Sequence, residues 1–391
     1  MTPAAIPLPR RHDVDWLRTL ALGLLIIFHI LLSFQSWAAS SGFPQNDVLL
    51  EELVPFISML AVWRIPLLFL ISGMGVRFAM ERRNWKQLLK DRSIRILIPY
   101  LFGTYVLGTI LVVGLPYLGW DAEYTLNFGH LWFLLNIFLY VVWLIGILIY
   151  LKDSPNNPLL RFLSKIIRWP MGLFLFALPL MVETWLVKPE YFSIYVDTVH
   201  GWLMGLICFF MGFIFIATQD VFWPAVAKTR WSALVVAASL YLVRFLVFGL
   251  GEEHQWLTAL ESVSWMLAIL GFGSMYLNKP SRSLAYLGIA VYPVYIVHLP
   301  VQFVIAYFLL PLSLPAYLKL TLLLAGTFGV CLLLYEYSLR RMKWIRPLFG
   351  MKLNQTWNQR SAPSKVFGSR GDTAAGNDQA SRSDRRSIAR R

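Results

Sequence analysis

The sequence predicts an all-α, polytopic integral membrane protein with about ten transmembrane helices and both termini in the cytoplasm. Of its 391 residues, 58% are hydrophobic and only 14% are charged, which leaves too little polar surface to cover a water-soluble globule. Ten apolar runs reach or approach the length that spans a bilayer. They cover residues 16–38, 53–76, 96–118, 130–151, 169–187, 200–218, 231–250, 257–277, 284–310 and 317–339.

The segments between these runs alternate in charge. The N-terminus and the even-numbered connections are basic, and the second connection carries seven Lys and Arg residues between Arg77 and Arg95. The odd-numbered connections are mainly acidic. Since basic loops stay in the cytoplasm, this alternation fits ten spans with both termini inside. The net charge of +14 therefore indicates membrane orientation, and no nucleic-acid partner is expected.

The two ends of the chain differ in character. The first run is longer than the about 7 to 15 apolar residues of a signal peptide, so we expect it to remain as the first span. Residues 1–350 are predicted to form a transmembrane domain, and residues 351–391 a disordered, basic cytoplasmic tail. The tail either contacts anionic lipid or only solubilises the chain. Cys208 and Cys331 lie inside apolar runs, so neither a disulfide framework nor a cysteine metal site is expected.

Several ionisable residues fall inside the predicted spans. Arg18 and His29 are eleven residues apart, which is three helical turns plus about 20° and a rise of about 16 Å, so both lie on one stripe. A histidine within a span marks either a functional site or a satisfied packing contact. His298 is expected at a depth similar to that of His29, with Glu261 approaching the same layer from the outer side. Pairing is expected among the intramembrane charges, which include Arg64 and Arg244.

A second polar layer is expected at the inner helix ends. Clustered arginines there suit an anionic ligand such as a phosphorylated cofactor, although such charges also enforce topology. Ser72 is interpreted either as part of this layer or as a small residue that permits close helix packing. The members of the layer are Asp15, Arg18, Ser72, Gly73, Arg92, Arg95 and Glu336.

Three histidines, His130, His200 and His254, map to the outer face. They come from separate connections without the spacing of metal ligands, so no metal site is predicted. Trp132, close to His130, is expected either at an interfacial aromatic belt or near a substrate.

A set of motifs resembles the membrane-bound acyltransferase 3 family over about residues 12 to 350. The motifs are Asp15-x-x-Arg18-x10-His29, Phe69-Leu-Ile-Ser72-Gly73, Arg92-x-x-Arg95-Ile-Leu-Ile-Pro99-Tyr100, His130-Leu-Trp-Phe-Leu and Val294-Tyr295-Ile-Val-His298-x-Pro300. Their order along the spans makes the resemblance specific. Within the family, Glu261-Ser262-Val263 and Leu334-Tyr335-Glu336 are similar to the glucan biosynthesis protein C branch, which is thought to succinylate periplasmic glucans. Leu68 departs from the pattern, because it replaces the first Phe of a Phe-Phe-x-x-Ser-Gly motif.

The resemblance implies an enzyme of the bacterial inner membrane that transfers an acyl group, succinyl or acetyl, from cytoplasmic acyl-CoA to a carbohydrate hydroxyl outside the cytoplasm. The resemblance implies no permanently bound cofactor, because acyl-CoA is a substrate. It leaves the oligomeric state of the protein open. His29 would act as general base or as a nucleophile that forms an acyl-histidine. The remaining implied roles are catalytic for His298 and Glu261, donor-binding for Arg18, Arg92, Arg95 and Ser72, and substrate-binding for Arg64, His130 and Trp132.

Two other classes of protein fit the spans. A transporter for an anionic or sugar-like solute would also need intramembrane charges, although the sequence has no recognisable repeat. A membrane sensor or scaffold would not need Arg18 and His29 to be aligned on one stripe.

Overall fold

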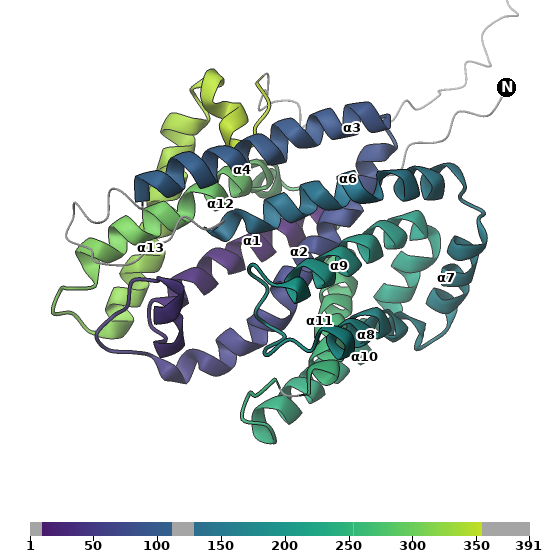
Figure 1. Ribbon diagram of the computed structural model, residues 1–391, viewed down its shortest axis with the longest axis horizontal. Coiled ribbons are helices and arrows are strands. Elements are labelled where there is room, and N and C mark those ends of the chain that lie inside the picture. Colours follow the sequence, from purple (N-terminus) through teal and green to yellow (C-terminus); the bar gives the residue numbers. More distant parts are fainter. Residues whose placement is uncertain (1–9, 112–128, 253, 354–391) are drawn as a thin grey trace, which may run out of the picture. The chain divides into compact units, whose positions relative to one another are not determined.

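The computed structural model describes residues 10–111, 129–252 and 254–353, and within these ranges it consists of helices and connecting loops without a strand (Figure 1). The all-α prediction is therefore confirmed for the described residues. Most of the predicted tail, residues 354–391, lies outside them.

Nine helices in the described part are long and apolar enough to cross a membrane. With the short helical turns that extend them, they cover His12–Leu32, Glu51–Met80, Trp85–Leu111, Gly129–Asp153, Val199–Ala217, Gln219–Leu246, Gln255–Tyr276, Arg282–Leu309 and Ala316–Leu339. The α-helices are α1 (His12–Leu32), α2 (Val54–Met80), α3 (Trp85–Arg92), α4 (Ile98–Phe102), α6 (Trp132–Asp153), α7 (Pro158–Arg168), α8 (Leu178–Val187), α9 (Val199–Ala217), α10 (Gln219–Leu246), α11 (Gln255–Tyr276), α12 (Arg282–Leu309) and α13 (Ala316–Leu334).

The fifth predicted run is the one that falls short of a span. Instead of a helix over 169–187, the chain forms a shorter apolar helix, Gly172–Val187, in which a 3₁₀ segment, Gly172–Ala177, precedes α8. Pro170 precedes this segment, and Pro179 occupies the first turn of α8. With about 2.0 Å per 3₁₀ residue and 1.5 Å per α residue, its length is about 27 Å, slightly less than the hydrocarbon core.

The third span begins earlier than predicted. Its first turn is fixed by a capping box in which the Asn84 side chain accepts from the Gln87 N–H and the Gln87 side chain accepts from the Asn84 N–H. The helix then continues through a π-helical segment, Ser93–Leu97. Arg92 and Arg95, predicted beside the helix, therefore lie within it, where their side-chain directions are defined.

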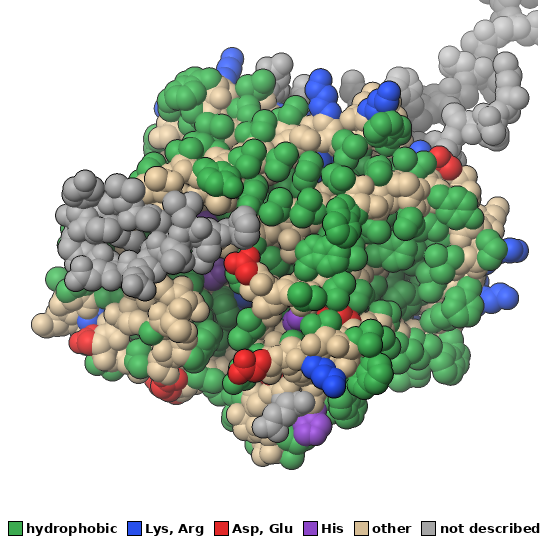
Figure 2. Space-filling model, viewed as in Figure 1, with side chains coloured by type: hydrophobic (Ala, Val, Ile, Leu, Met, Phe, Trp, Pro, Cys, Tyr) green, Lys and Arg blue, Asp and Glu red, His purple; other side chains and the backbone are tan. Residues whose placement is uncertain are grey.

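Helix α1 lies at the centre of the bundle and packs against α2, α11 and α12 (Figure 1). Two other tight pairs, α2 with α9 and α10 with α11, build the side that carries α8. Apolar side chains cover most of the face seen in Figure 2, with Lys and Arg mainly along its upper and right edges. The two histidines predicted at similar depth thus lie on neighbouring helices, His29 on α1 and His298 on α12.

The contact between α2 and α9 requires glycine. A Cβ atom at Gly73 would lie 1.8 Å from the Phe209 carbonyl oxygen, and one at Gly212 would lie 1.9 Å from the Leu70 carbonyl oxygen. Backbones can approach this closely only where a side chain is missing. The Ser72-Gly73 motif is explained here by its glycine, because the Ser72 hydroxyl donates to the Leu68 carbonyl of its own helix at 2.8 Å.

We predict that Gly73→Ala destabilises the bundle by about 1–3 kcal/mol, because the methyl group forces α2 away from α9. Gly75, two residues further along α2, is the matched control, because a Cβ atom there would have no neighbouring atom within 4 Å. Gly75→Ala should be neutral or stabilising by up to about 1 kcal/mol, through helix propensity. Apparent melting temperatures of the purified variants in one detergent measure the difference; equal values would contradict the close approach.

Candidate active site

The site is centred on a hydrogen bond between the half-buried His29 and the fully buried His298. The Nδ1 atom of His29 lies 2.8 Å from the Nε2 atom of His298, and the ring planes are within 2° of parallel. His298 is fully buried, and its helix packs directly against α1. The structure thus brings together the two histidines that the sequence placed at one depth.

The hydrogen-bond partners fix which ring atoms carry protons. The Nδ1 atom of His298 lies 2.5 Å from the Tyr295 carbonyl oxygen, which can only accept, so Nδ1 carries a proton. In the neutral ring Nε2 of His298 is then an acceptor, and it receives the proton on Nδ1 of His29. The Nε2 atom of His29 then carries a lone pair without a hydrogen-bond partner among the described residues, as a general base or nucleophile requires.

His130 joins the pair from a third element, the 3₁₀ turn Gly129–Leu131 before α6. Its Nε2 donates to the Tyr295 carbonyl at 3.1 Å, and the Tyr295 hydroxyl donates to the His130 carbonyl. The ring centres of His130 and His298 are 4.7 Å apart. Pro300 lies one turn after Ile296 and has no N–H group to donate to the Ile296 carbonyl. That carbonyl therefore lacks its usual helical donor, which adds an acceptor to this turn of α12.

Arg64 is a buried cation close to this centre. Its guanidinium carbon lies 3.7 Å from the ring centre of Phe28, the neighbour of His29, and the residue is 4% exposed. Its Nε and Nη1 atoms have no hydrogen-bond partner among the described residues. A buried charge without an anionic partner is costly in a membrane, so an anionic ligand beside Arg64 would be stabilised.

The N-terminal part of α1 and the segment from just before α3 to the π-helical turn after it carry a cluster of four arginines, Arg18, Arg83, Arg92 and Arg95, whose charges act on one another. Two carboxylates offset them in part: Asp15 lies 3.2 Å from Arg18, and Asp91 lies 3.1 Å from Arg95. Helix α12 also reaches this layer, where the Tyr292 hydroxyl donates to the Arg95 carbonyl. The cluster keeps an excess of positive charge, which suits phosphate groups.

Comparison with known proteins identifies the family. A family model described as an acyltransferase domain matches residues 11–336, which include both histidines and the arginine cluster. The chain belongs to the acyltransferase 3 family. The family assignment favours an O-acyltransferase over the transporter and scaffold alternatives, so the protein is a membrane O-acyltransferase.

Relatives of the acyltransferase are similar along most of their length. The glucans biosynthesis protein C sequences of Salmonella paratyphi B, Salmonella dublin and Salmonella enteritidis are each 24% identical to this chain over 367 residues, covering 86% of this chain and 94% of theirs. No solved structure matches the acyltransferase significantly.

The structure does not bring Glu261 to the histidines. Both carboxylate oxygens bind Arg244, with Oε2 2.8 Å from Nε and Oε1 3.1 Å from Nη2, and the Ser58 hydroxyl accepts from the same guanidinium. This buried pair joins α10, α11 and α2. Of the pairings expected among intramembrane charges, Arg244 with Glu261 is present, and Arg64 is left out. Trp132, predicted near the substrate, packs on Phe69 with ring centres 5.9 Å apart.

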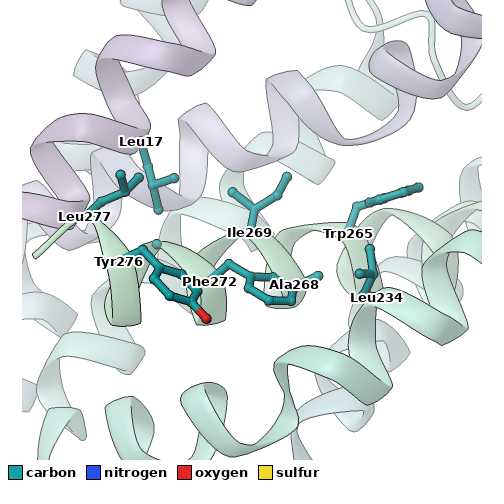
Figure 3. Close-up of a pocket in the computed structure, with 9 residues that line it drawn as sticks. Leu17, Leu234, Trp265, Ala268, Ile269, Phe272, Tyr276 and Leu277 are labelled. Carbon is teal, nitrogen blue, oxygen red and sulfur yellow. The ribbon is translucent and has the colours of Figure 1, made fainter.

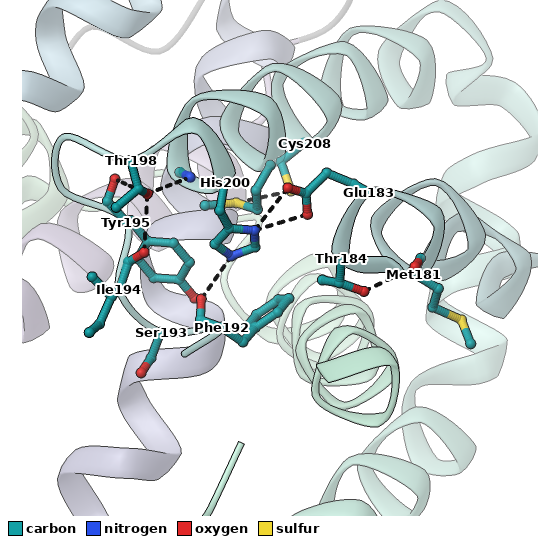
Figure 4. Close-up of polar contacts among 12 residues, drawn as sticks. Met181, Glu183, Thr184, Phe192, Ser193, Ile194, Tyr195, Thr198, His200 and Cys208 are labelled. Atoms are coloured by element: carbon teal, nitrogen blue, oxygen red, sulfur yellow. Dashed lines mark hydrogen bonds and ion pairs between the residues drawn. The ribbon is translucent and has the colours of Figure 1, made fainter. Parts of the chain in front are cut away.

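A second buried histidine contact was missed by sequence reasoning. His200 lies with Nδ1 2.9 Å from both carboxylate oxygens of Glu183 and with Nε2 2.9 Å from the Phe192 carbonyl (Figure 4). Glu252 accepts from the N–H and hydroxyl of Ser193 in the same segment, and burial raises the pKa of the Glu252 carboxyl. These contacts fasten the segment before α9. The signal in the sequence that could have indicated these contacts is that Glu183 lies near the end of one apolar run and His200 at the start of the next.

Two hollows lie near these elements. The larger, about 310 Å³, is walled by apolar residues of α1, α10 and α11 such as Leu17, Trp265 and Phe272, and it contains no histidine or arginine (Figure 3). The smaller, about 20 Å³, adjoins His130 and Pro300 and has room for about one water molecule. Of the two, the smaller hollow is therefore the one that adjoins a member of the histidine cluster, His130. Within the described ranges, no group of three or more His, Cys, Asp or Glu side chains could hold a metal ion.

We predict that Glu261→Gln destabilises the protein by about 3–5 kcal/mol, because it leaves Arg244 buried without a counter-charge. The double variant Arg244→Gln/Glu261→Gln removes both charges and should recover most of the loss. Melting temperature and acyl transfer per folded molecule are measured together for both. A double variant that is stable but inactive would instead show that Glu261 takes part in the reaction.

Proposed function

We propose that this acyltransferase moves a succinyl or acetyl group from cytoplasmic acyl-CoA to a hydroxyl of a periplasmic or surface glycan, such as an osmoregulated periplasmic glucan. The observation that carries the proposal is the His29–His298 hydrogen bond, which lies about three helical turns along α1 from a cluster of four arginines. The names of the relatives, glucans biosynthesis protein C, support a glucan acceptor.

The donor is held at the inner end of α1. Arg18, Arg92 and Arg95 bind the phosphates of acyl-CoA through charge-assisted hydrogen bonds. Ser72 is assigned to the path of the pantetheine arm. α1 is one unbroken helix from His12 to Leu32, so the pantetheine arm has about 16 Å to cover between Arg18 and His29. The thioester then reaches the histidines, while the acceptor approaches from the other side past His130 and Trp132.

Transfer is a proton-coupled exchange at the thioester carbonyl. The Nε2 atom of His29 takes the proton of the acceptor hydroxyl as its oxygen attacks the carbonyl carbon. The tetrahedral intermediate collapses, the carbon–sulfur bond breaks, and the CoA thiolate takes the same proton back from His29. The alternative is attack by Nε2 itself, which breaks the carbon–sulfur bond, releases the CoA thiolate and gives an acyl-histidine; the acceptor hydroxyl then attacks the acyl carbon, the bond to Nε2 breaks, and the hydroxyl proton goes to the thiolate.

Arg64 favours succinyl over acetyl as the transferred group. A succinyl group ends in a carboxylate, which supplies the counter-charge that the buried guanidinium lacks within the described residues. Acetyl offers no such charge. If Arg64 instead stabilises the oxyanion of the intermediate, it serves both acyl groups equally.

The orientation follows from the charge pattern. We assign the enzyme to the bacterial inner membrane, with the helix Gly172–Val187 as a tenth crossing and both termini in the cytoplasm. The basic residues of the connection before it, such as Lys152 and Arg168, support a cytoplasmic position for its beginning. Its small deficit in length is within what local thinning of a bilayer accommodates.

We predict that His29→Ala abolishes glycan esterification, with a loss of about 10²-fold or more in rate, because Nε2 is the only base that the histidine pair presents. Mass spectrometry of periplasmic and surface glycans, at matched protein abundance, measures ester-linked succinyl or acetyl groups. His254→Ala is the control, since that histidine stacks on Phe248 away from the centre. Unchanged esterification in His29→Ala would exclude this base; a glycan pool that never depends on the protein would exclude the function.

We predict that Arg64→Met lowers the ratio of succinyl to acetyl transfer by about tenfold or more, because a charge-assisted contact to the terminal carboxylate is lost. Purified protein is assayed with succinyl-CoA and acetyl-CoA in parallel, and Arg64→Lys, which keeps the charge, should retain part of the preference. An equal loss of activity with both donors would indicate that Arg64 stabilises the oxyanion. An unchanged ratio of succinyl to acetyl transfer at full activity would show that Arg64 does not contact the acyl group.

A further inference from the structure

Two amide side chains, the buried Gln302 and the half-buried Gln45, contact backbone carbonyls near the C-terminal end of α1, and these carbonyls fix the orientation of each amide. The Gln302 amide nitrogen donates to the His29 carbonyl at 2.9 Å. The Gln45 amide nitrogen donates to the carbonyls of Leu32, at 3.2 Å, and Phe43, at 3.0 Å. Because a carbonyl only accepts, each amide nitrogen must face it, and each Oε1 atom must point elsewhere.

These outward oxygens have no donor. Among the described residues, Oε1 of Gln302 and Oε1 of Gln45 are buried without a hydrogen-bond partner, as are Gln35 Oε1 and Ser33 Oγ nearby in the chain. Gln302 itself is fully buried. Nearly all buried polar atoms in proteins are paired, so a group of unpaired acceptors marks a place where a donor-rich ligand would be stabilised.

An aromatic wall stands beside the amides. The Phe43 ring centre is 5.7 Å from that of His29 and 5.6 Å from that of Phe303, which follows Gln302 on α12. Leu299 and Leu111 complete this apolar cluster. Aromatic and aliphatic surface with a few placed polar groups is the usual lining of a small-molecule site, and it suits the C–H face of a sugar ring.

The amides and the arginines lie on opposite sides of the catalytic histidine. Along α12, Tyr292 touches the inner cluster, His298 contacts His29, and Gln302 follows one further turn away. Along α1, the order is Arg18, His29 and Leu32. The two polar layers therefore flank the His29–His298 hydrogen bond.

We propose that Gln302 and Gln45, with Phe43, form the acceptor-binding site, and that it selects a neutral, hydroxyl-rich sugar. Sugar hydroxyls donate to the two amide oxygens while the ring lies on the aromatic wall. Carbonyl-type acceptors repel carboxylates and phosphates, so this layer disfavours uronic acids and phosphorylated sugars. The inference rests on the proposed function, because it assigns the second substrate of that reaction.

The test measures the KM of each substrate separately. The full-length protein in detergent is given succinyl-CoA and a linear, neutral glucose hexasaccharide, and succinylated sugar is quantified by mass spectrometry. Gln302→Met and Gln45→Met keep the side-chain length and remove the amide. Each should raise the KM for the hexasaccharide by about three- to tenfold, as expected for one lost hydrogen bond, and leave the KM for succinyl-CoA unchanged. Ser262→Ala, which removes an unpaired buried hydroxyl on α11, is the control and should change neither constant.

The outcomes separate this inference from the function on which it rests. Unchanged hexasaccharide KM in both variants, with an active wild type, overturns the acceptor site alone. A fall in kcat with both KM values unchanged shows that the amides only hold α1 in place, which also overturns it. Gln45 donates to the Leu32 and Phe43 carbonyls and not to that of His29, so it decides the matter even if Gln302→Met displaces His29. A wild type that consumes no acyl-CoA with any acceptor overturns the proposed function.

Discussion

The hydrogen bond between His29 and His298 is the contact on which the site depends. It joins α1 to α12 in a region where the membrane offers no water to satisfy a polar ring. The Tyr295 carbonyl at the far end sets the tautomer of both rings, and Pro300 adds another acceptor to that turn. A single backbone feature of α12 thereby decides which nitrogen of His29 carries the proton.

Charges inside the bundle fall into two kinds. Arg244 and Glu261 satisfy each other and connect three helices, which is a structural use of charge. The Arg64 guanidinium lies over the face of Phe28, and its Nε and Nη1 atoms have no hydrogen-bond partner within the described residues. Composition and depth do not distinguish these arginines, yet Arg244 is neutralised by a carboxylate of the fold and Arg64 has no carboxylate partner among the described residues. Such a contrast is what distinguishes binding groups from packing groups in an apolar interior.

Much of this arrangement could be predicted from sequence. Apolar length predicted nine of the spans, and helical rise placed His29 and His298 at one depth because depth depends only on residue count. Lateral neighbours do not follow from residue count, so the partner of Glu261 could not be deduced. The early start of the third span depends on the Asn84 cap, a local hydrogen bond that hydropathy does not register. The position of Gln302 near the histidines could have been predicted from the sequence, since it lies four residues after His298 on the same helical face.

The chain of hydrogen bonds from His29 ends at a backbone carbonyl rather than at a carboxylate. A carbonyl oxygen cannot take up a proton at ordinary pH, so a proton that enters the histidine pair has no exit through Tyr295. It must leave by the nitrogen at which it arrived. In the proposed reaction the histidine pair would therefore exchange protons with the substrates on one side only, and acyl transfer would not open a path for protons across the bilayer.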